Sequence, residues 1–363
     1  MNPPNQGHAP KFLLLPVQII ETSLGLILKR GCLQLKIQGK GAAAAVRRLI
    51  PLASSHPQPL DTLVAYFDEP EQPHIERFLH LLIAKNLLVP VGEATASKTQ
   101  TMESPLDVFY WHFGETTEGV TERLNRMPVA IVGVNLLSRK LVQSLHASGL
   151  TNLKIVDHPL LRNASLLDNK GKMRKLEEEK EDLGIPMNLK EWEAYRNSSS
   201  SMTMVVTSEF GLTPLFHDLN SHCVENNFHF FPVWLEDMIG YVGPLVIPGE
   251  SACFHCARAR MNSHADDPRT QDLIDRADWS ETPTVGFHPA MIAMLGNLAA
   301  FELTKFYSSL FSNSILGRMV EISLLGPRLK SRKIFKIPRC LVCSPLRTTP
   351  SITPKLDVCM EPK

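Results

Sequence analysis

The sequence has no uninterrupted hydrophobic run long enough to cross a lipid bilayer. The most apolar stretch near its start, residues 12–28, contains Pro16, Gln18 and Glu21, whereas a spanning helix needs about 20 consecutive apolar residues. The first ten residues are polar and proline-rich, unlike the basic and apolar regions of a secretory signal peptide. We therefore expect a cytoplasmic protein with no membrane contact.

A large excess of charge of either sign is also lacking. The 363 residues carry 38 Lys and Arg against 37 Asp and Glu, a formal net charge of +1. This balance gives no general attraction to nucleic acid, so we expect no nucleic-acid partner. With 44% hydrophobic and 21% charged residues, the composition is that of an ordinary globular protein, and the length allows two or three domains.

Cysteines suited to a disulfide scaffold are lacking as well. There are seven cysteines, an odd number, and Cys32, Cys223 and Cys359 have no partner at a useful spacing. A secreted disulfide framework usually has an even number of cysteines at regular spacings. The pattern therefore argues against such a framework.

The remaining four cysteines form two C-x-x-C pairs, Cys253 with Cys256 and Cys340 with Cys343. Two such pairs supply four thiolates, which suits a tetrahedral structural Zn²⁺. Four free buried thiols, two disulfides and a redox pair are the alternatives. We favour zinc, because pairs of this spacing in cytosolic proteins serve metal or redox chemistry, and neither pair lies in a thioredoxin-like strand-to-helix pattern.

The first part of the chain reads as a small domain of short strands followed by helices. Leu33, Leu35 and Ile37 alternate with polar residues, which predicts a strand with one wet face. Strands followed by three helices resemble a winged helix-turn-helix. We predict a meander of strands at 13–20, 25–30 and 33–38, helices at 41–53, 60–67 and 73–86, and a closing strand at 87–91.

The second part begins with a strand, a turn, a helix and a second strand that ends at an acid, Asp157. This order is that of a dinucleotide-type βαβ unit. Phosphate binding at such a turn requires glycines, because backbone N–H groups must approach the phosphate. Gly133 is present, but Asn135 and Ser138 hold the later positions. We interpret the turn as a degenerate nucleotide loop and expect no ATP on this chain.

The other predicted elements alternate between strands and helices, which indicates an α/β fold with a mainly parallel sheet. A helix within 105–125 is expected to dock on the second domain, and the charged stretch 164–182 to be a solvated helix or an excursion. The domains are predicted as 1–95, a linker and docking segment at 96–126, 127–347, and a tail at 348–363. Later elements are predicted at 129–132, 136–148, 153–156, 202–207, 213–225, 228–235 and 289–306, with hairpins at 241–249 and at 319–325 with 333–337.

With these motifs placed, the second domain resembles the ThiF/MoeB-type, ubiquitin-activating-like fold. The resemblance rests on Val-Ala-Ile-Val-Gly133, Lys-Ile-Val-Asp157 and the two C-x-x-C pairs. The run 242–249 leading into 252–258, with Pro-Arg-Cys-Leu-Val-Cys343 at the end, resembles one subfamily. Its members are the leader-peptide-binding partners, the cyclodehydratase C/F-type proteins, of YcaO enzymes that make thiazole/oxazole-modified microcins. The N-terminal domain is similar to the PqqD-like peptide-recognition element of these proteins.

The resemblance implies an accessory subunit that is not catalytic alone. It would bind the leader of a ribosomal precursor peptide and present the peptide to a YcaO cyclodehydratase, which uses ATP to convert Cys, Ser or Thr to azolines. The resemblance also implies a structural zinc and a possible homodimer. The first alternative is an ATP-dependent adenylating enzyme. The second is a zinc-containing winged-helix regulator that acts on DNA. Glu76 beside Arg77 on the third helix argues against it, because a carboxylate makes this face a poor one for contacting phosphates.

The predicted leader site is the edge of the strand at 33–38, because helices and not another strand come directly after it in the first domain. An edge strand has unpaired backbone groups that an extended peptide can complete. The resemblance places the leader between this strand and the third helix, with acidic leader residues meeting basic residues at the rim. The alternative is that the apolar members are simply core. The predicted residues are Leu33, Gln34, Leu35, Lys36, Ile37, Arg77, Phe78, Leu81 and Lys85.

Overall fold

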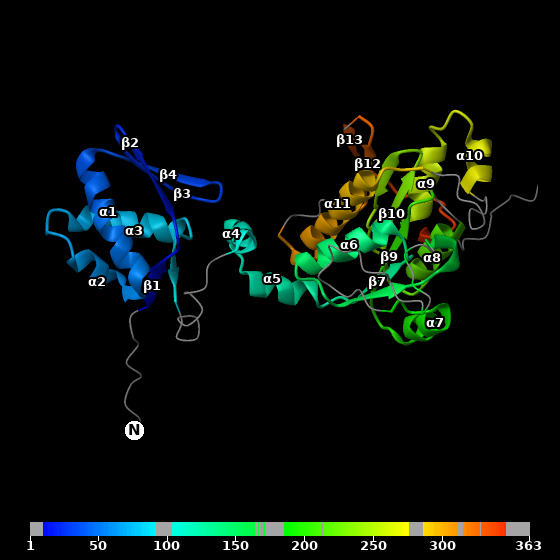
Figure 1. The fold of residues 1–363 in the computed structure, drawn as a ribbon, viewed down its shortest axis with the longest axis horizontal. Helices are drawn as coiled ribbons and strands as arrows, with labels where there is room; N and C mark the ends of the chain where they lie inside the picture. Colours follow the sequence, from blue (N-terminus) through cyan, green and yellow to red (C-terminus); the bar gives the residue numbers. More distant parts are fainter. Residues whose placement is uncertain are drawn as a thin grey trace, which may run out of the picture. The chain divides into compact units, whose positions relative to one another are not determined.

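The structure is a computed structural model, shown in Figure 1, and the chain divides into two compact units, residues 1–120 and 121–363. The division falls inside the segment 96–126 that the sequence predicts as a linker. Most of the predicted excursion at 164–182 and all of the tail at 348–363 lie outside the described residues. The described residues are 10–91, 104–163, 166, 168, 170, 185–211, 214–275, 286–310, 315–326 and 328–345.

The first unit contains two small antiparallel sheets with strand orders β2-β3-β4 and β5-β1-β6. The single strand predicted at 13–20 is wrong, because the segment is interrupted around Pro16 and its two ends enter different sheets. Proline has no N–H to donate to a ladder. The strands are β1 Lys11–Leu14, β2 Gln18–Thr22, β3 Gly25–Arg30, β4 Leu33–Gln38, β5 Gln58–Pro59 and β6 Leu88–Pro90.

Three helices share one apolar core with the β2-β3-β4 sheet, and each lies within two residues of its predicted bounds. They are α1 Lys40–Ser55, α2 Leu60–Ala65 and α3 Gln72–Ala84. Leu26 and Leu28 of β3 share one buried apolar cluster with Leu49 of α1 and with Leu79 and Leu82 of α3. The helical spacing of apolar residues therefore produces the core that the sequence indicates.

The helix predicted within 105–125 is two helices, α4 Pro105–His112 and α5 Thr117–Leu124. They separate at Gly114, whose φ of 78° belongs to the left-handed region that favours glycine. The prediction that this segment docks on the second domain is wrong for α4, which packs on the first unit. Trp111 Nε1 donates to the carbonyl of Asn86 (2.7 Å), and the Arg30 guanidinium lies 4.7 Å from the centre of the Trp111 ring.

The second unit is built on a seven-stranded sheet of order β13-β12-β11-β10-β9-β7-β8. The sheet is mixed, which corrects the expectation of a mainly parallel sheet: β8, β7, β9 and β10 are parallel, and β11, β12 and β13 are antiparallel. The strands are β7 Val129–Val132, β8 Leu153–Val156, β9 Thr203–Ser208, β10 His229–Glu236, β11 Ile239–Val242, β12 Arg318–Ser323 and β13 Arg328–Lys333.

Two predicted hairpins are displaced. β11 pairs with β10 across a two-residue turn at Asp237 and Met238, both with positive φ, as a type I′ hairpin requires. The hairpin predicted at 241–249 is therefore wrong, since only its first residues are strand. β13 lies at 328–333 rather than 333–337, because this exposed strand is too charged to be recognised by its hydrophobicity.

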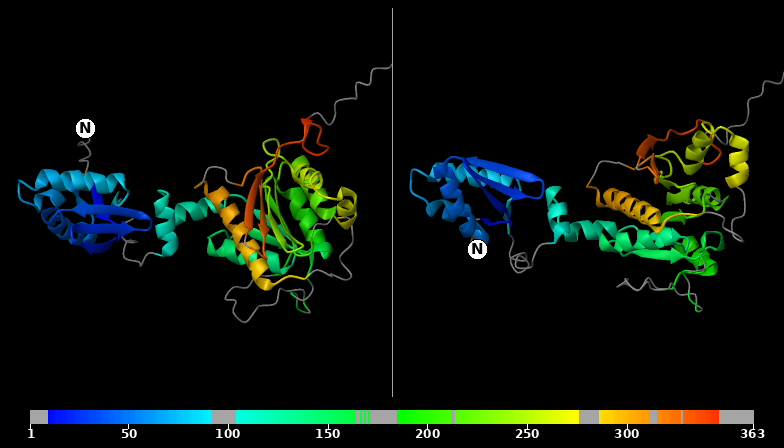
Figure 2. Two further views of the ribbon diagram at one scale, coloured as in Figure 1. Left: turned by 90° about the horizontal axis from the view of Figure 1, so that it is seen from above. Right: turned by 45° about the horizontal axis from the view of Figure 1, so that its top comes forward.

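Helices cover both faces of this sheet (Figures 1 and 2). The helices α6 and α11 lie on one face, and α8 and α9 lie on the other. Gly296 of α11 lies so close to α6 that an added Cβ would be 3.1 Å from the backbone nitrogen of Leu141. The helices are α6 Leu136–Ala147, α7 Leu189–Ser198, α8 Pro214–Glu225, α9 Phe254–Asn262, α10 Pro268–Asp275 and α11 Pro289–Ser308, with a short 3₁₀ helix at Pro159–Leu161.

None of the described helices combines the length and the apolar composition that a bilayer span would require.

Candidate functional sites

The two C-x-x-C pairs come together into one buried cluster of four thiols. All four sulfur atoms lie within 4.8 Å of one another. Cys253 Sγ lies 3.9 Å from Cys256 Sγ and 3.6 Å from Cys340 Sγ, and Cys256 Sγ lies 3.6 Å from Cys343 Sγ. A tetrahedral zinc with Zn–S bonds of about 2.3 Å holds its sulfur ligands about 3.8 Å apart. The four cysteines therefore could bind a metal ion and fit a zinc-sized one.

Each pair is held by a different local structure. Cys253 is the N-cap of α9 and Cys256 lies in its first turn, while Cys340 and Cys343 lie in a turn after β13. The backbone N–H of Ile337 donates to Cys256 Sγ (3.3 Å). The hydrogen bond from the Cys253 thiol lowers the pKa of Cys256 to about 5. Metal binding requires thiolates, and this hydrogen bond favours the thiolate form of Cys256. The bond to Cys256 and burial raise the pKa of Cys253, and burial raises the pKa of Cys343 to about 11, so a bound metal would have to displace the protons of these two thiols.

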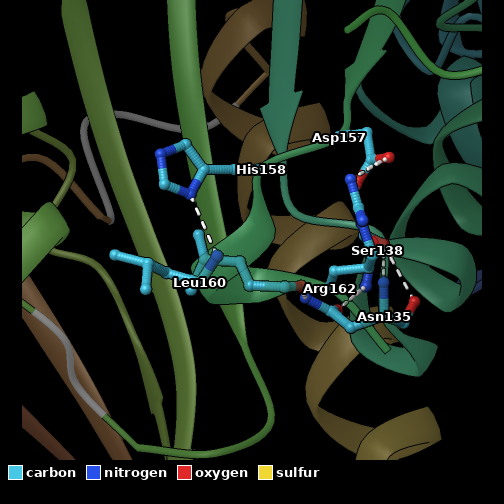
Figure 3. A network of polar contacts seen from close by, with 7 residues as sticks. Asn135, Ser138, Asp157, His158, Leu160 and Arg162 are labelled. Carbon is cyan, nitrogen blue, oxygen red and sulfur yellow. Dashed lines mark hydrogen bonds and ion pairs between the residues drawn. The ribbon is translucent and has the colours of Figure 1, made fainter. Parts of the chain in front are cut away.

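The strand-to-helix turn after β7 is filled by its own side chains (Figure 3). Asn135 and Ser138 form a capping box: the Ser138 N–H donates to Asn135 Oδ1 (2.8 Å), and the Asn135 N–H donates to Ser138 Oγ (3.1 Å). Asn135 is fully buried and also donates to the carbonyl of Thr207 (3.0 Å). The two residues that replace glycines thus cap α6.

Glu209, at the end of β9, places a buried carboxylate against the N-terminus of α6. Its Oε2 accepts from the Leu136 N–H (2.8 Å), and its Oε1 accepts from Asn163 Nδ2 (2.7 Å). A helix N-terminus at this position is where a nucleotide phosphate binds in dinucleotide folds. Here an internal anion takes that position. No sequence motif identifies Glu209 as an anion at the N-terminus of α6, so this role was missed.

Asp157, the acid at the end of β8 in the degenerate nucleotide loop, is engaged by an arginine that sequence reasoning did not identify. Arg162 donates from Nε to Asp157 Oδ1 and from Nη2 to Oδ2, both at 2.8 Å. Figure 3 shows this two-point pair beside the capped turn. A bidentate pair of this kind is among the stronger charged hydrogen-bond arrangements. Both oxygens of Asp157 therefore have a partner within the chain.

Burial raises the pKa of Glu209 above the usual glutamate value, and its three N–H donors only partly offset this effect. Between the usual pKa and the raised one, the folded chain binds more protons than the unfolded chain. The free energy of unfolding should therefore fall as pH rises through this window. We expect Glu209→Gln to remove that fall. Urea unfolding of both proteins, followed by tryptophan fluorescence across this pH range, measures it; parallel pH profiles would contradict the expectation.

β4 lies at one end of the β2-β3-β4 sheet, and no strand among the described residues pairs with its outer side. The Gly39 N–H donates to the carbonyl of Leu24 (2.8 Å), and the register from Gly25↔Gln38 to Arg30↔Leu33 has no interruption. In an antiparallel ladder, bonded pairs alternate with non-bonded pairs. The backbone groups of Leu33, Leu35 and Ile37 therefore bond to β3, and those of Gln34, Lys36 and Gln38 point outward.

The other predicted leader-site residues divide by burial. Leu33, Leu35, Ile37 and Phe78 are half-buried and pack against one apolar core cluster. Leu81 is 41% exposed, and Arg77 and Lys85 on and after α3 are exposed. The structure thus brings the apolar residues of β4 and Phe78 onto one core while part of each remains accessible.

Comparison with known proteins shows the fold. No protein-family model matches the chain, and no curated protein matches it. Among solved structures, E. coli MccB with AMPCPP and MccA has 16% identity and a TM-score of 0.60, over 92% of this chain and 99% of that one. MccB in complex with N-formylated MccA gives 16% identity and a TM-score of 0.60, over 92% and 100% of the two chains.

A heterocyclase in complex with substrate and cofactor is also similar, with 15% identity and a TM-score of 0.56 over 93% of this chain. The chain spans only 40% of the heterocyclase. At these identities the likeness shows the fold alone. The mixed sheet and the helices on both its faces are those of a ThiF-like α/β fold.

Proposed function

We propose that this chain binds the leader of a ribosomally made precursor peptide and presents the peptide to a YcaO cyclodehydratase. The observation that carries the proposal is the outward edge of β4 beside half-buried apolar side chains. It is supported by the structural likeness, over 92% of this chain, to MccB crystallised with MccA. The first unit would act as a PqqD-like, winged-helix recognition domain. A homodimer remains an expectation from the resemblance.

The second unit would serve as a scaffold for this delivery, not as the site of ATP chemistry. Three features support this part of the proposal. Asn135 and Ser138 cap α6 where a phosphate would approach, Glu209 supplies an anion at the same helix terminus, and Asp157 is paired with Arg162. A phosphate placed there would meet a carboxylate of like charge. The ATP-dependent step would then belong to the YcaO partner.

Structural zinc is the second component of the proposal. The sulfur separations of 3.6 to 3.9 Å fit a tetrahedral ion. Because all four positions are taken by thiolates, no open position is left for a substrate or a water. Such a closed site would stabilise the fold and would not catalyse a reaction.

Reconstitution tests the proposed function. We expect a YcaO protein encoded beside this chain to form azolines on its precursor efficiently only when this chain is present. Each ring would appear as the loss of one water in the mass of the peptide. A precursor without its leader should no longer respond to this chain. Full activity of the YcaO protein without this chain would contradict the proposal.

Adenylation is the alternative that a specific observation favours, because MccB structures with ATP or AMPCPP share this fold. We expect Mg-ATP to show no micromolar binding in calorimetric titration of the purified full chain. The physical reason is the repulsion and lost access created by Glu209 and the capped turn. Micromolar binding together with ATP–pyrophosphate exchange would instead establish the adenylating alternative.

A further inference from the structure

β13 is a basic strand at the end of the seven-stranded sheet. All six of its residues are exposed, and their sequence is Arg-Leu-Lys-Ser-Arg-Lys. Residues 322–345 contain no Asp or Glu, although the whole chain is nearly neutral. The same stretch carries six basic residues: Arg328, Lys330, Arg332, Lys333, Lys336 and Arg339. Positive charge is therefore concentrated at one edge of the second unit, where Figure 1 shows β12 and β13.

The outer backbone of β13 has no partner strand among the described residues. The Ile334 N–H donates to the carbonyl of Gly317 (2.8 Å), and the register with β12 is continuous from Arg318↔Lys333 to Ser323↔Arg328. By the alternation of an antiparallel ladder, even-numbered residues of β13 bond to β12. The backbone groups of Leu329, Ser331 and Lys333 therefore point outward and can accept another strand.

The side chains of β13 give this edge a charge preference. Arg328, Lys330 and Arg332 share one face of the sheet because side chains alternate along a strand. Lys330 and Arg332 both reach Glu321 of β12, at 3.5 and 3.0 Å. One carboxylate against three cations leaves the face positive. Beside Arg332 lies a cavity of about 380 Å³, which is also lined by Arg260, His264, Lys333 and the carboxylate of Glu321.

We propose that β13 takes up an extended segment of a partner polypeptide that carries acidic residues at alternate positions. Its backbone would bond to Leu329, Ser331 and Lys333, and its carboxylates would face Arg328, Lys330 and Arg332. This site is separate from the leader site on β4 and does not depend on the proposed function.

Two features favour a polypeptide over nucleic acid. The outward N–H and C=O groups match a strand and not a phosphate backbone. In addition, Leu329 and Phe335 are 59% and 58% exposed on and just after the strand, where apolar side chains of a polypeptide could pack. Basic residues on an edge can also serve to block pairing between sheets, and the experiment distinguishes these possibilities.

The test uses the full chain and a fluorescein-labelled peptide of alternating threonine and glutamate, measured by fluorescence anisotropy. We expect binding to this peptide and not to a threonine/lysine peptide of equal length. The Ser331 N–H points outward and makes no ladder bond to β12. Ser331→Pro removes this N–H and should weaken binding about tenfold. Arg328→Gln with Lys330→Gln should also weaken binding, whereas Lys154→Gln on β8, at the opposite edge, should leave it unchanged.

Thermal unfolding checks that each variant is folded. If Ser331→Pro does not fold, Leu329→Pro tests a second outward position. The proposal is overturned if the acidic peptide does not bind. It is also overturned if oligothymidylate competes equally and both folded proline variants bind normally, since this would show binding by charge alone. Binding that falls with the prolines but persists with oligothymidylate present supports it.

Discussion

Replacing Cys256 with serine is expected to abolish stoichiometric metal binding and to destabilise the second unit by about 4 kcal/mol or more. Cys253 and Cys340 lie 87 residues apart in sequence but 3.6 Å apart at their sulfur atoms. A metal that joins the two pairs closes this long loop and restricts the unfolded chain. In the variant, the other three thiols, which are buried or half-buried, would be left without the ion that they share.

Metal analysis of the purified proteins and urea unfolding followed by tryptophan fluorescence measure both effects. We expect one zinc per chain in the unmodified protein. Cys32→Ser is the matched control, because Cys32 is exposed on the first unit and should change neither quantity. A metal-free chain that unfolds at the same urea concentration as the zinc-loaded protein would contradict the assignment of a structural metal.

The elements that the sequence predicts well are those with a strong local pattern. β7 and β8 have their predicted bounds, and α6 and α11 lie within two residues of theirs. Buried parallel strands are short continuous apolar runs, and helices on a sheet have a clear apolar stripe. The grouping of the four cysteines was also predicted, because two C-x-x-C pairs have the spacing that suits one tetrahedral metal site.

The parts that the sequence did not predict depend on partners far along the chain. β13 has no hydrophobic pattern, and its strand conformation depends on pairing with β12. The β10–β11 turn contains no glycine, so Asp237 and Met238 gave no hairpin signal. Glu209 reaches Leu136, which is 73 residues away. No spacing rule relates an acid after one strand to a helix that begins after another.

Replacing Lys36 with proline is expected to weaken leader binding about tenfold or more while the first unit stays folded. The Lys36 N–H points outward from β4 and makes no bond to β3, so its loss spares the existing sheet. The proline ring would also obstruct an incoming strand. Fluorescence anisotropy measures the effect, with the full chain and a labelled leader that a neighbouring precursor gene encodes.

Three controls separate strand addition from other causes. Lys36→Ala keeps the N–H and should retain most of the affinity. Ile19→Pro places the same change on β2, the other edge of the sheet, and should not affect binding. Ile37→Pro removes an inward N–H from the ladder with β3, so it should lower stability as well as affinity. Normal binding by a folded Lys36→Pro variant would show that β4 does not receive the leader.

The central claim is that a leader peptide pairs with the outer edge of β4, and residue-resolved amide hydrogen exchange tests it most directly. The amides of Leu35 and Ile37 should already be protected in the free protein by their bonds to β3. Addition of the leader to the full chain should newly protect the amides of Gln34, Lys36 and Gln38. Unchanged exchange at these three amides with a bound leader, or new protection on β2 instead, would contradict the account.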